Sequence, residues 1–268
     1  MTPQFQLVNT ADGSVSCVES ETGQLCHNSA GAYTEAITNY ARPSGLMDTL
    51  RQQGHIRVLD ACYGLGYNSW ALINEIANRF PSFENAGSSS GSGVPKTYTV
   101  TVVAIERFPE VLGFLPHVLD HPTFDALKNK IPPSEHNAYY RTLECFCNTK
   151  GVLDEVRFLA MDLAGGLRIA LELWVSDLRQ RVVKLKPGFD AIFHDPFSPQ
   201  KMPELWSVDL FREYYRLLEP KSGLVLTYSA AAAVRGGLLE AGFTVAKTQP
   251  LGAKSGGTLA TVCHRPDR

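Results

Sequence analysis

Short apolar runs alternate with amphipathic stretches along most of the chain. Residues 56–60 are apolar and β-branched, and they lead through a glycine-containing turn into residues 67–80, whose apolar positions fall on one helix face. Residues 98–105 are almost all β-branched or apolar, which is typical of a central parallel strand covered on both sides. This succession of strand, turn, helix and strand predicts a parallel sheet between layers of helices.

The same reading extends to the C-terminus. Further strands are predicted at 156–161, 188–194, 223–228, 243–248 and 258–263, and an irregular strand at 138–147. Helices are predicted at 111–119, 163–183, 205–218 and 230–240. The last two strands are expected to pair antiparallel. The fold class is therefore a three-layer α/β, Rossmann-like domain with a mostly parallel, seven-stranded sheet.

Residues 1–54 form a small N-terminal extension before this domain, which we expect to span 55–268. Asp12-Gly13 predicts a hairpin turn, and helices are expected at 32–41 and 46–54. Residues 81–97 are rich in glycine and serine and predict a flexible insertion.

Composition excludes several classes of protein. Hydrophobic residues make up 44% and charged residues 19% of the 268, which is typical of a folded globular chain and not of a disordered one. No apolar stretch approaches the about 20 residues of a membrane span, and the first residues do not resemble a secretory signal. We expect a cytoplasmic protein with no membrane partner, whose six cysteines, none in a CxxC pair, are free thiols.

Charge is distributed unevenly. Residues 1–178 hold 12 Lys and Arg against 19 Asp and Glu, whereas residues 179–268 hold 13 against 8. The basic C-terminal third leaves room for a phosphate-binding face. No metal site is predicted, because His117 and His121 are spaced i, i+4 but have no third ligand.

Four predicted strands end in an acidic residue: Asp60, Glu106, Asp162 and Asp195. Ligands of open α/β sheets bind beyond the carboxyl ends of the strands, so these carboxylates are expected to meet in one crevice. The turn that contains Gly64 lets backbone approach a ligand closely, and no GK[ST] follows, which excludes a P-loop. Carboxylates favour a cation over a phosphate, so a nucleoside that carries a sulfonium fits this edge better than NAD or ATP.

These residues carry a resemblance. Residues 60–68, followed by Glu106 and Asp162, resemble the S-adenosylmethionine-binding core of class I methyltransferases. Residues 194–206 (HDPFSPQKMPELW) resemble the signature of the methyltransferase domain of MnmC and its stand-alone relatives, the MnmD proteins. The segments 226–230 and 234–243, and at the N-terminus 12–14 and 27–32 with Glu35, resemble the same family, so that the resemblance spans most of 9–263.

The resemblance implies an enzyme that uses S-adenosylmethionine to methylate the aminomethyl group on the wobble uridine of tRNA, giving 5-methylaminomethyl-(2-thio)uridine. Its partner is the anticodon loop, and the fused flavin-dependent oxidase domain of MnmC is expected to be absent. The residues expected to bind the cofactor are Glu35, Asp60, Tyr63, Gly64, Gly66, Asn68, Glu106, Arg107, Asp162, Leu163 and Asp195. Those expected to bind the substrate are Pro196, Phe197, Ser198, Lys201, Trp206, Arg235 and Lys254.

Asp195 is the candidate catalytic residue. Methyl transfer from a sulfonium is an in-line displacement, in which positioning dominates and the attacking amine must be neutral. A carboxylate at the end of the fourth strand is able to accept an N–H or the proton itself, and Phe197 is placed to stack on a base.

The chain departs from the family pattern in several places. Cys62 stands where the glycine turn usually has its first glycine, Met202 stands where asparagine is usual, and the insertion at 81–97 and the extra residues at 125–150 and 170–187 are also unusual. Two alternatives therefore stay open: a small-molecule or polyamine-type transferase of the same fold, and a cofactor-binding scaffold without turnover.

Overall fold

The computed structural model describes residues 4–20, 23–79, 97–148, 154–248 and 256–262. The segment predicted to be a flexible insertion lies almost entirely outside these residues, as does Lys254. The N-terminal part holds β1 (Phe5–Asn9), β2 (Val15–Glu19), β3 (Gln24–Leu25), α1 (Ala32–Ala36), a π-helical turn (Ile37–Ala41) and α2 (Leu46–Gln53).

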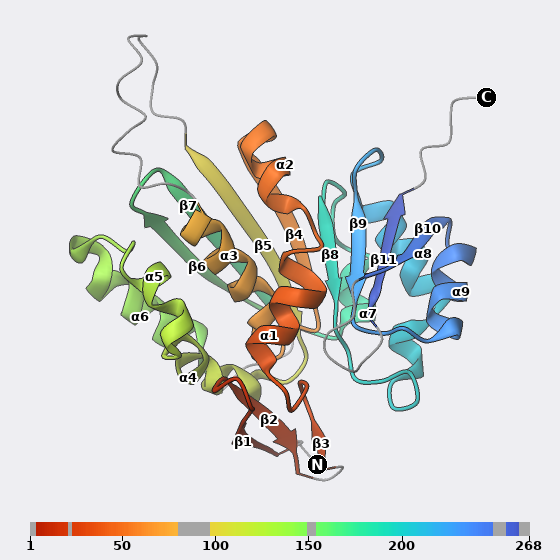
Figure 1. Ribbon diagram of the computed structural model, residues 1–268, viewed down its shortest axis with the longest axis horizontal. Coiled ribbons are helices and arrows are strands. Elements are labelled where there is room, and N and C mark those ends of the chain that lie inside the picture. The colour runs from red at the N-terminus through yellow and green to blue at the C-terminus, as the bar shows by residue number, and fades with distance from the viewer. Residues whose placement is uncertain (1–3, 21–22, 80–96, 149–153, 249–255, 263–268) are drawn as a thin grey trace.

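An eight-stranded sheet forms the centre of the molecule (Figure 1), in the order β10-β11-β9-β8-β4-β5-β7-β6. Its strands are β4 (His55–Ala61), β5 (Tyr98–Glu106), β6 (Glu155–Leu163), β7 (Leu167–Val175), β8 (Ala191–His194), β9 (Leu224–Thr227), β10 (Phe243–Lys247) and β11 (Thr258–Val262). The α-helices that accompany them are α3 (Tyr67–Arg79), α4 (Leu115–Leu119), α5 (Asp125–Lys128), α6 (His136–Phe146), α7 (Leu178–Val182), α8 (Val208–Leu217) and α9 (Ala232–Glu240). Short 3-10 turns occupy Pro109–Phe114, Pro122–Phe124, Pro133–Glu135 and Pro203–Trp206.

Alternation along the central strands builds two cores, one on each face of the sheet. Val58 and Val102 point into the core shared with α3, α4 and α6, whereas their neighbours Leu59 and Val103 point into the core shared with α7, α8 and α9. Because successive side chains of a strand face opposite sides, an uninterrupted apolar run is what a sheet covered on both faces requires. The predicted three-layer, mostly parallel α/β fold is confirmed.

The chain changes direction across the sheet at β4. It runs from β4 to β5 and β7 on one side, then returns to β8 and β9 on the other, and all of these strands are parallel to β4 or to each other. Their carboxyl ends therefore open at one edge, and the sheet β1–β3 lies across that edge, at the bottom of Figure 1. Ligand sites of open α/β sheets form at such a switch point.

The N-terminal hairpin is attached to this edge by specific contacts. Gly13, with φ of 85°, makes the predicted turn, and Val15 pairs with Asn9 across the hairpin. The Asp12 carboxylate accepts hydrogen bonds from the Thr34 backbone and hydroxyl, and the Val15 N–H donates to the Tyr67 hydroxyl at 3.1 Å. The hairpin is thereby joined to α1 and to α3.

Two predicted elements are wrong. The helix predicted over 163–183 is instead strand β7 followed by the short α7, because residues 167–175 alternate strictly between buried and more exposed positions. β7 pairs antiparallel with β6 through a turn at Gly165 and Gly166, and this adds the eighth strand to a sheet predicted to have seven.

The irregular strand predicted over 138–147 is helix α6. Tyr139, Leu143 and Phe146 are buried at helical spacing and pack into the core beside β6.

Candidate active site

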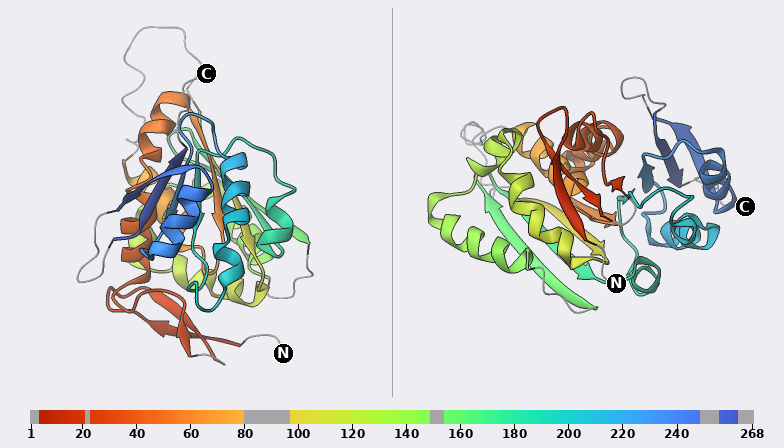
Figure 2. Two further views of the ribbon diagram at one scale, coloured as in Figure 1. Left: turned by 90° about the vertical axis from the view of Figure 1, so that its right-hand side faces the viewer. Right: turned by 90° about the horizontal axis from the view of Figure 1, so that it is seen from below.

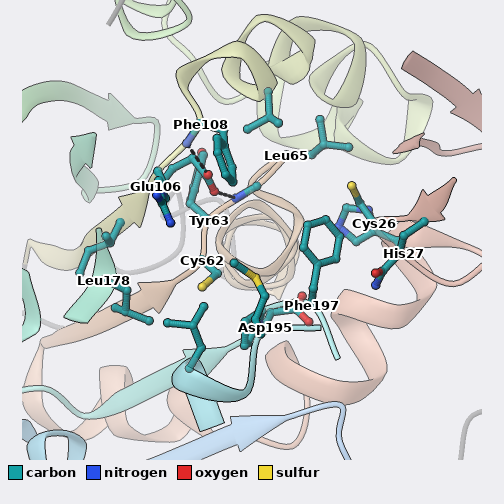
Figure 3. A pocket seen from close by; sticks show the side chains of 18 of the residues that line it. Cys26, His27, Cys62, Tyr63, Leu65, Glu106, Phe108, Leu178, Asp195 and Phe197 are labelled. Atoms are coloured by element: carbon teal, nitrogen blue, oxygen red, sulfur yellow. Dashed lines mark hydrogen bonds between the residues drawn. The ribbon is translucent and has the colours of Figure 1, made fainter. Parts of the chain in front are cut away.

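A cavity of about 310 Å³ opens at the carboxyl edge of the sheet. The turns after β4, β5, β7 and β8 form its base, and the N-terminal sheet contributes Phe5, Cys17, Leu25 and Cys26 to its wall. Figure 3 shows side chains from these elements pointing toward one another, although they lie far apart in the sequence.

The turn after β4 has the left-handed backbone that its glycines predict. Gly64 and Gly66 have φ of 54° and 80°. A Cβ at Gly66 would lie 2.5 Å from the Tyr63 ring, whose hydroxyl accepts a hydrogen bond from Trp70 Nε1 at 2.8 Å, so only glycine fits there. Cys62 also has a positive φ, 70°, an uncommon conformation for a residue with a side chain, and it lines the cavity.

Glu106 ends β5 beside this turn, and its carboxylate is held by backbone donors. Oε2 accepts from Gly64 N at 2.7 Å, and Oε1 accepts from Phe108 N at 2.8 Å. Burial raises the pKa of Glu106, while these backbone hydrogen bonds oppose the rise. Each carboxylate oxygen has a further lone pair, so Glu106 is able to accept two more hydrogen bonds from a ligand in the cavity.

Asp195 follows β8 on the opposite side of β4. Its Oδ2 accepts a 2.8 Å hydrogen bond from Asn68 Nδ2, at the start of α3. Burial raises the pKa of Asp195, and hydrogen bonds from Asn68 and Tyr40 oppose this rise. The carboxylate is therefore more basic than an exposed aspartate and is fixed in direction.

Two side-chain hydrogen bonds hold the turn after Asp195. Pro196, Phe197 and Ser198, the residues expected to bind the substrate, line the cavity. The Tyr228 hydroxyl donates to Pro196 O at 3.0 Å, and Trp206 Nε1 donates to Phe197 O at 2.9 Å. Trp206 itself is buried and is not among the residues that line the cavity, so it supports the turn 196–198 from the side away from the cavity.

Asp162 and Leu163 are not brought to the site. β6 runs antiparallel to β7, so its C-terminal end lies at the opposite edge of the sheet from the cavity. There the exposed Asp162 carboxylate faces Arg168 at 3.9 Å. The expectation that Asp162 ends a parallel strand is wrong, because β6 runs antiparallel to its neighbour β7.

Asp177 follows the parallel strand β7 and lines the cavity, although it was not among the residues predicted from the sequence. Arg179 donates to both of its oxygens, at 2.9 Å from the backbone and 3.1 Å from the guanidinium, and Arg107 lies 3.7 Å away. The Arg179 hydrogen bond leads the interactions that lower the pKa of Asp177. The alternation of residues 167–175 was the signal that would have placed this aspartate at a strand end.

Four other residues predicted to bind the cofactor lie in or below the cavity. Glu35, Tyr63 and Arg107 line the cavity, and Glu35 accepts a 2.7 Å hydrogen bond from Asn28 N. Asp60 is fully buried and accepts a 2.5 Å hydrogen bond from the Ser69 hydroxyl, so it supports the turn from below. Burial raises the pKa of Asp60 well above its usual range.

Two of the predicted basic contacts, Lys201 and Arg235, do not line the cavity, and the third, Lys254, lies outside the described residues. Lys201 is exposed, and its backbone N–H donates to Ser198 O at 2.9 Å. Arg235 donates to the Thr258 hydroxyl at 3.0 Å. Within the described residues, no cluster of three or more His, Cys, Asp or Glu is arranged to hold a metal ion. Every helix in those parts of the chain is too short or too polar to cross a membrane.

Comparisons with known proteins agree with this architecture. Residues 152–262 match the protein family described as S-adenosyl-L-methionine-dependent methyltransferase. The crystal structure of MnmC2 from Aquifex aeolicus is 26% identical and superposes with a TM-score of 0.63, covering 97% of this chain and 70% of that one. The bifunctional protein MnmC of Cupriavidus necator, named for tRNA 5-methylaminomethyl-2-thiouridine biosynthesis, is 38% identical over 240 residues, which are 88% of this chain.

Other relatives are longer than this chain. An uncharacterized protein of Methanocaldococcus jannaschii is 29% identical over 255 residues, or 95% of this chain. These 255 residues span 58% of the Methanocaldococcus jannaschii protein. The 240 residues matched in the Cupriavidus necator protein span 31% of that protein. The fold is Rossmann-like, and over most of its length the chain is similar to MnmC-type methyltransferases, which confirms the resemblance predicted from its sequence.

Proposed function

We propose that this protein transfers a methyl group from S-adenosylmethionine to the aminomethyl nitrogen of a tRNA wobble uridine, giving 5-methylaminomethyl-(2-thio)uridine. The observation that carries the proposal is a pair of carboxylates around one cavity, the buried Glu106 at the end of β5 and the half-buried Asp195 after β8. The similarity to MnmC-type proteins supports the choice of substrate.

The residues present fit the cofactor. The cavity lies within the roughly 300–1,000 Å³ of small-molecule sites. Its carboxylates attract a cation, and S-adenosylmethionine supplies a methyl group on a positively charged sulfur. Glu106 would accept the ribose hydroxyls with its remaining lone pairs, and Gly64 would let the backbone approach the ligand.

The adenine would lie on the β7 side of Glu106. Leu178 and Phe108 offer apolar surface there, and Asp177 offers an acceptor for an exocyclic amine. Arg179 and Arg107 keep Asp177 ionised and aimed at the cavity. In this arrangement Asp177 takes the position that the sequence had suggested for Asp162.

The methyl acceptor would enter on the β8 side. Asp195 would accept an N–H of the amine and take its proton, because burial has raised the basicity of this carboxylate. Asn68 holds the carboxylate in one direction, so that the amine lone pair is left to face the methyl group. Phe197 would stack on the uracil ring, and Lys201 at the rim would contact phosphate.

A second candidate function is methyl or alkyl transfer to a small polyamine. Glu35 and Glu204 line the cavity together with Asp195, and such an acidic wall also suits a flexible polycation. The two functions make different demands on Lys201. A phosphate contact loses affinity when the lysine is removed, whereas polyamine binding does not depend on it.

The decisive experiment is mass spectrometry of the wobble nucleosides in tRNA that carries 5-aminomethyluridine, after incubation with the protein and labelled S-adenosylmethionine. A label on the aminomethyl nitrogen is the expected result. Label on a polyamine but not on tRNA would establish the second candidate. Cofactor binding without label in either would mean that the protein is a scaffold.

A further inference from the structure

Two cysteines face each other in the N-terminal sheet, at the part of the cavity wall that we call its cover. Cys17 in β2 and Cys26, which follows β3, have their Sγ atoms 2.8 Å apart, and both line the cavity. The β2–β3 register pairs Val18 with Leu25, and the next pair along is Cys17 with Cys26, whose N–H donates to Cys17 O at 2.8 Å. The two thiols are thus direct cross-strand neighbours and not a chance surface contact.

The backbone at this pair is compatible with a covalent bond. Hydrogen-bonded partners in an antiparallel ladder have Cα atoms about 5.5 Å apart, and disulfides occur at Cα separations of roughly 4.4–6.8 Å. The sulfur atoms need to approach by less than 1 Å, from 2.8 Å to the about 2.05 Å of an S–S bond. A small side-chain rotation accomplishes this without a change in the strands.

We propose that Cys17 and Cys26 are a modification site at which a small disulfide oxidant forms a bond across the cover of the cavity. The half-buried Cys26 loses its proton, and its sulfur attacks one sulfur of the oxidant, so that the first thiol leaves and a mixed disulfide remains. Cys17 loses its proton and attacks Cys26 Sγ, which expels the second thiol. Two protein thiols and one oxidant disulfide become one protein disulfide and two small thiols, so atoms and electrons balance.

Reaction at this site is expected to be slow. The contact with the Cys17 thiol and burial raise the pKa of the Cys26 thiol. The negative charges of Glu106 and Asp195 raise it further. Only a small fraction of the attacking thiolate is therefore present at neutral pH. Uncatalysed exchange takes minutes to hours, and an excess of oxidant over hours is the appropriate treatment.

The bond would stabilise the cover of the cavity. It closes the loop from Cys17 to Cys26 and joins β2 to the segment that carries His27 and Asn28 into the wall. A loop of this length lowers the entropy of the unfolded chain enough to raise the melting temperature by about 5–10 °C. This inference does not depend on the proposed function, because the measurements below need no methyl acceptor.

The test is treatment of the full chain with excess oxidised glutathione, followed by thiol counting, calorimetry and peptide mapping. Cys17 and Cys26 lie on one tryptic peptide, but Glu19 and Glu21 stand between them, so glutamyl endopeptidase separates the two cysteines unless a disulfide joins them. We expect the peptides that carry Cys17 and Cys26 to be linked, with a mass two hydrogen atoms below the sum of the two free peptides, together with the rise in melting temperature.

The control variants are C17A/C26A and C145S. The double variant is expected to show no linked pair and no oxidant-dependent shift, even if its melting temperature starts lower, because the shift is measured within each variant. Cys145 is exposed on α6, and its variant is expected to behave like the parent protein. Six unreacted thiols, a bond from Cys26 to another cysteine, or a fall in melting temperature on oxidation would each overturn the proposal.

Discussion

The side chain of Asn68 donates a 2.8 Å hydrogen bond to the Asp195 carboxylate. This contact joins the first turn of α3 to the turn after β8, and it crosses the point at which the sheet changes direction. The glycine turn after β4 and the turn after β8 are therefore fixed relative to each other by one partly buried polar pair.

Replacement of Asp195 by alanine is expected to lower the methylation rate by roughly 10²-fold or more, the scale of general base catalysis. An alkyl amine is mostly protonated at neutral pH, so the rate should rise with pH in the parent protein. The variant should gain more from high pH than the parent, because the amine then loses its proton without help. Rates measured across pH with modified tRNA test this.

Cofactor affinity provides the control for Asp195. Calorimetry is expected to give S-adenosylmethionine dissociation constants for Asp195→Ala and the parent that agree within a few-fold. If the variant lost the cofactor and kept its residual turnover, Asp195 would belong to the cofactor site instead.

Glu106→Ala is expected to weaken S-adenosylmethionine binding by roughly 1.5–3 kcal/mol, the scale of hydrogen bonds to a charged group. The carboxylate would contact the ribose, and it also accepts from Gly64 N and Phe108 N, so its removal affects both ligand and turn. Glu106→Gln, which keeps an acceptor at one position, should lose less. Unchanged affinity in calorimetry would remove Glu106 from the cofactor site.

Asp177 and Asp162 form a matched pair of aspartates at opposite edges of the sheet. Asp177→Ala is expected to weaken cofactor binding by about 1.5–3 kcal/mol, the scale of a hydrogen bond to a charged group. Asp162→Ala should leave binding unchanged, because its only described ion-pair partner is Arg168, away from the cavity. The opposite ranking in calorimetry would contradict the strand assignment on which the site rests.

Cys62 tests the strain in the glycine turn. Its φ of 70° costs about 1–2 kcal/mol for a residue with a Cβ. At ordinary positions alanine is more stable than glycine by about 0.4–1 kcal/mol. At Cys62 we expect the reverse, with Cys62→Gly at least as stable as Cys62→Ala in denaturant unfolding.

Cys26 offers the comparison for Cys62, since it lines the same cavity and is not among the described non-glycine residues with positive φ. There the alanine variant should be the more stable of the two. If the order at Cys62 matched the order at Cys26, the turn would not be strained.

His194 makes stability depend on pH. It is fully buried among aromatic rings, and burial lowers its pKa from 6.5 to about 3. The unfolded chain therefore binds a proton between these values that the folded protein does not, so this group costs stability as pH falls below about 6.5 and leaves it unaffected above.

The measurement is the difference in unfolding free energy between the parent and His194→Gln. The glutamine keeps a polar partner for the Tyr214 hydroxyl but does not titrate. From pH 6.5 to 4 the parent should lose about 3 kcal/mol relative to the variant, at roughly 1.4 kcal/mol per pH unit. A difference that does not change with pH would show that His194 takes up its proton in the folded state.

Much of the fold could be predicted because its strands and turns depend on residues that are neighbours in the chain. The run of β-branched residues in β5, the glycine turn after β4 and the hairpin at Gly13 each depend on neighbours in the chain. Glu106 and Asp195 were found for the same reason, since each directly follows or ends a strand that the pattern makes clear.

The amino-acid sequence by itself determined the class of fold, the turn, and nine of the residues that line the cavity. Only the tertiary structure decided which strands run parallel, and hence that Asp177 and not Asp162 reaches the site. It also brought Cys17 and Cys26 together over the cavity. Strand direction depends on which strands pair, and cross-strand neighbours depend on the register of that pairing, so neither can be read from the apolar pattern of one strand alone.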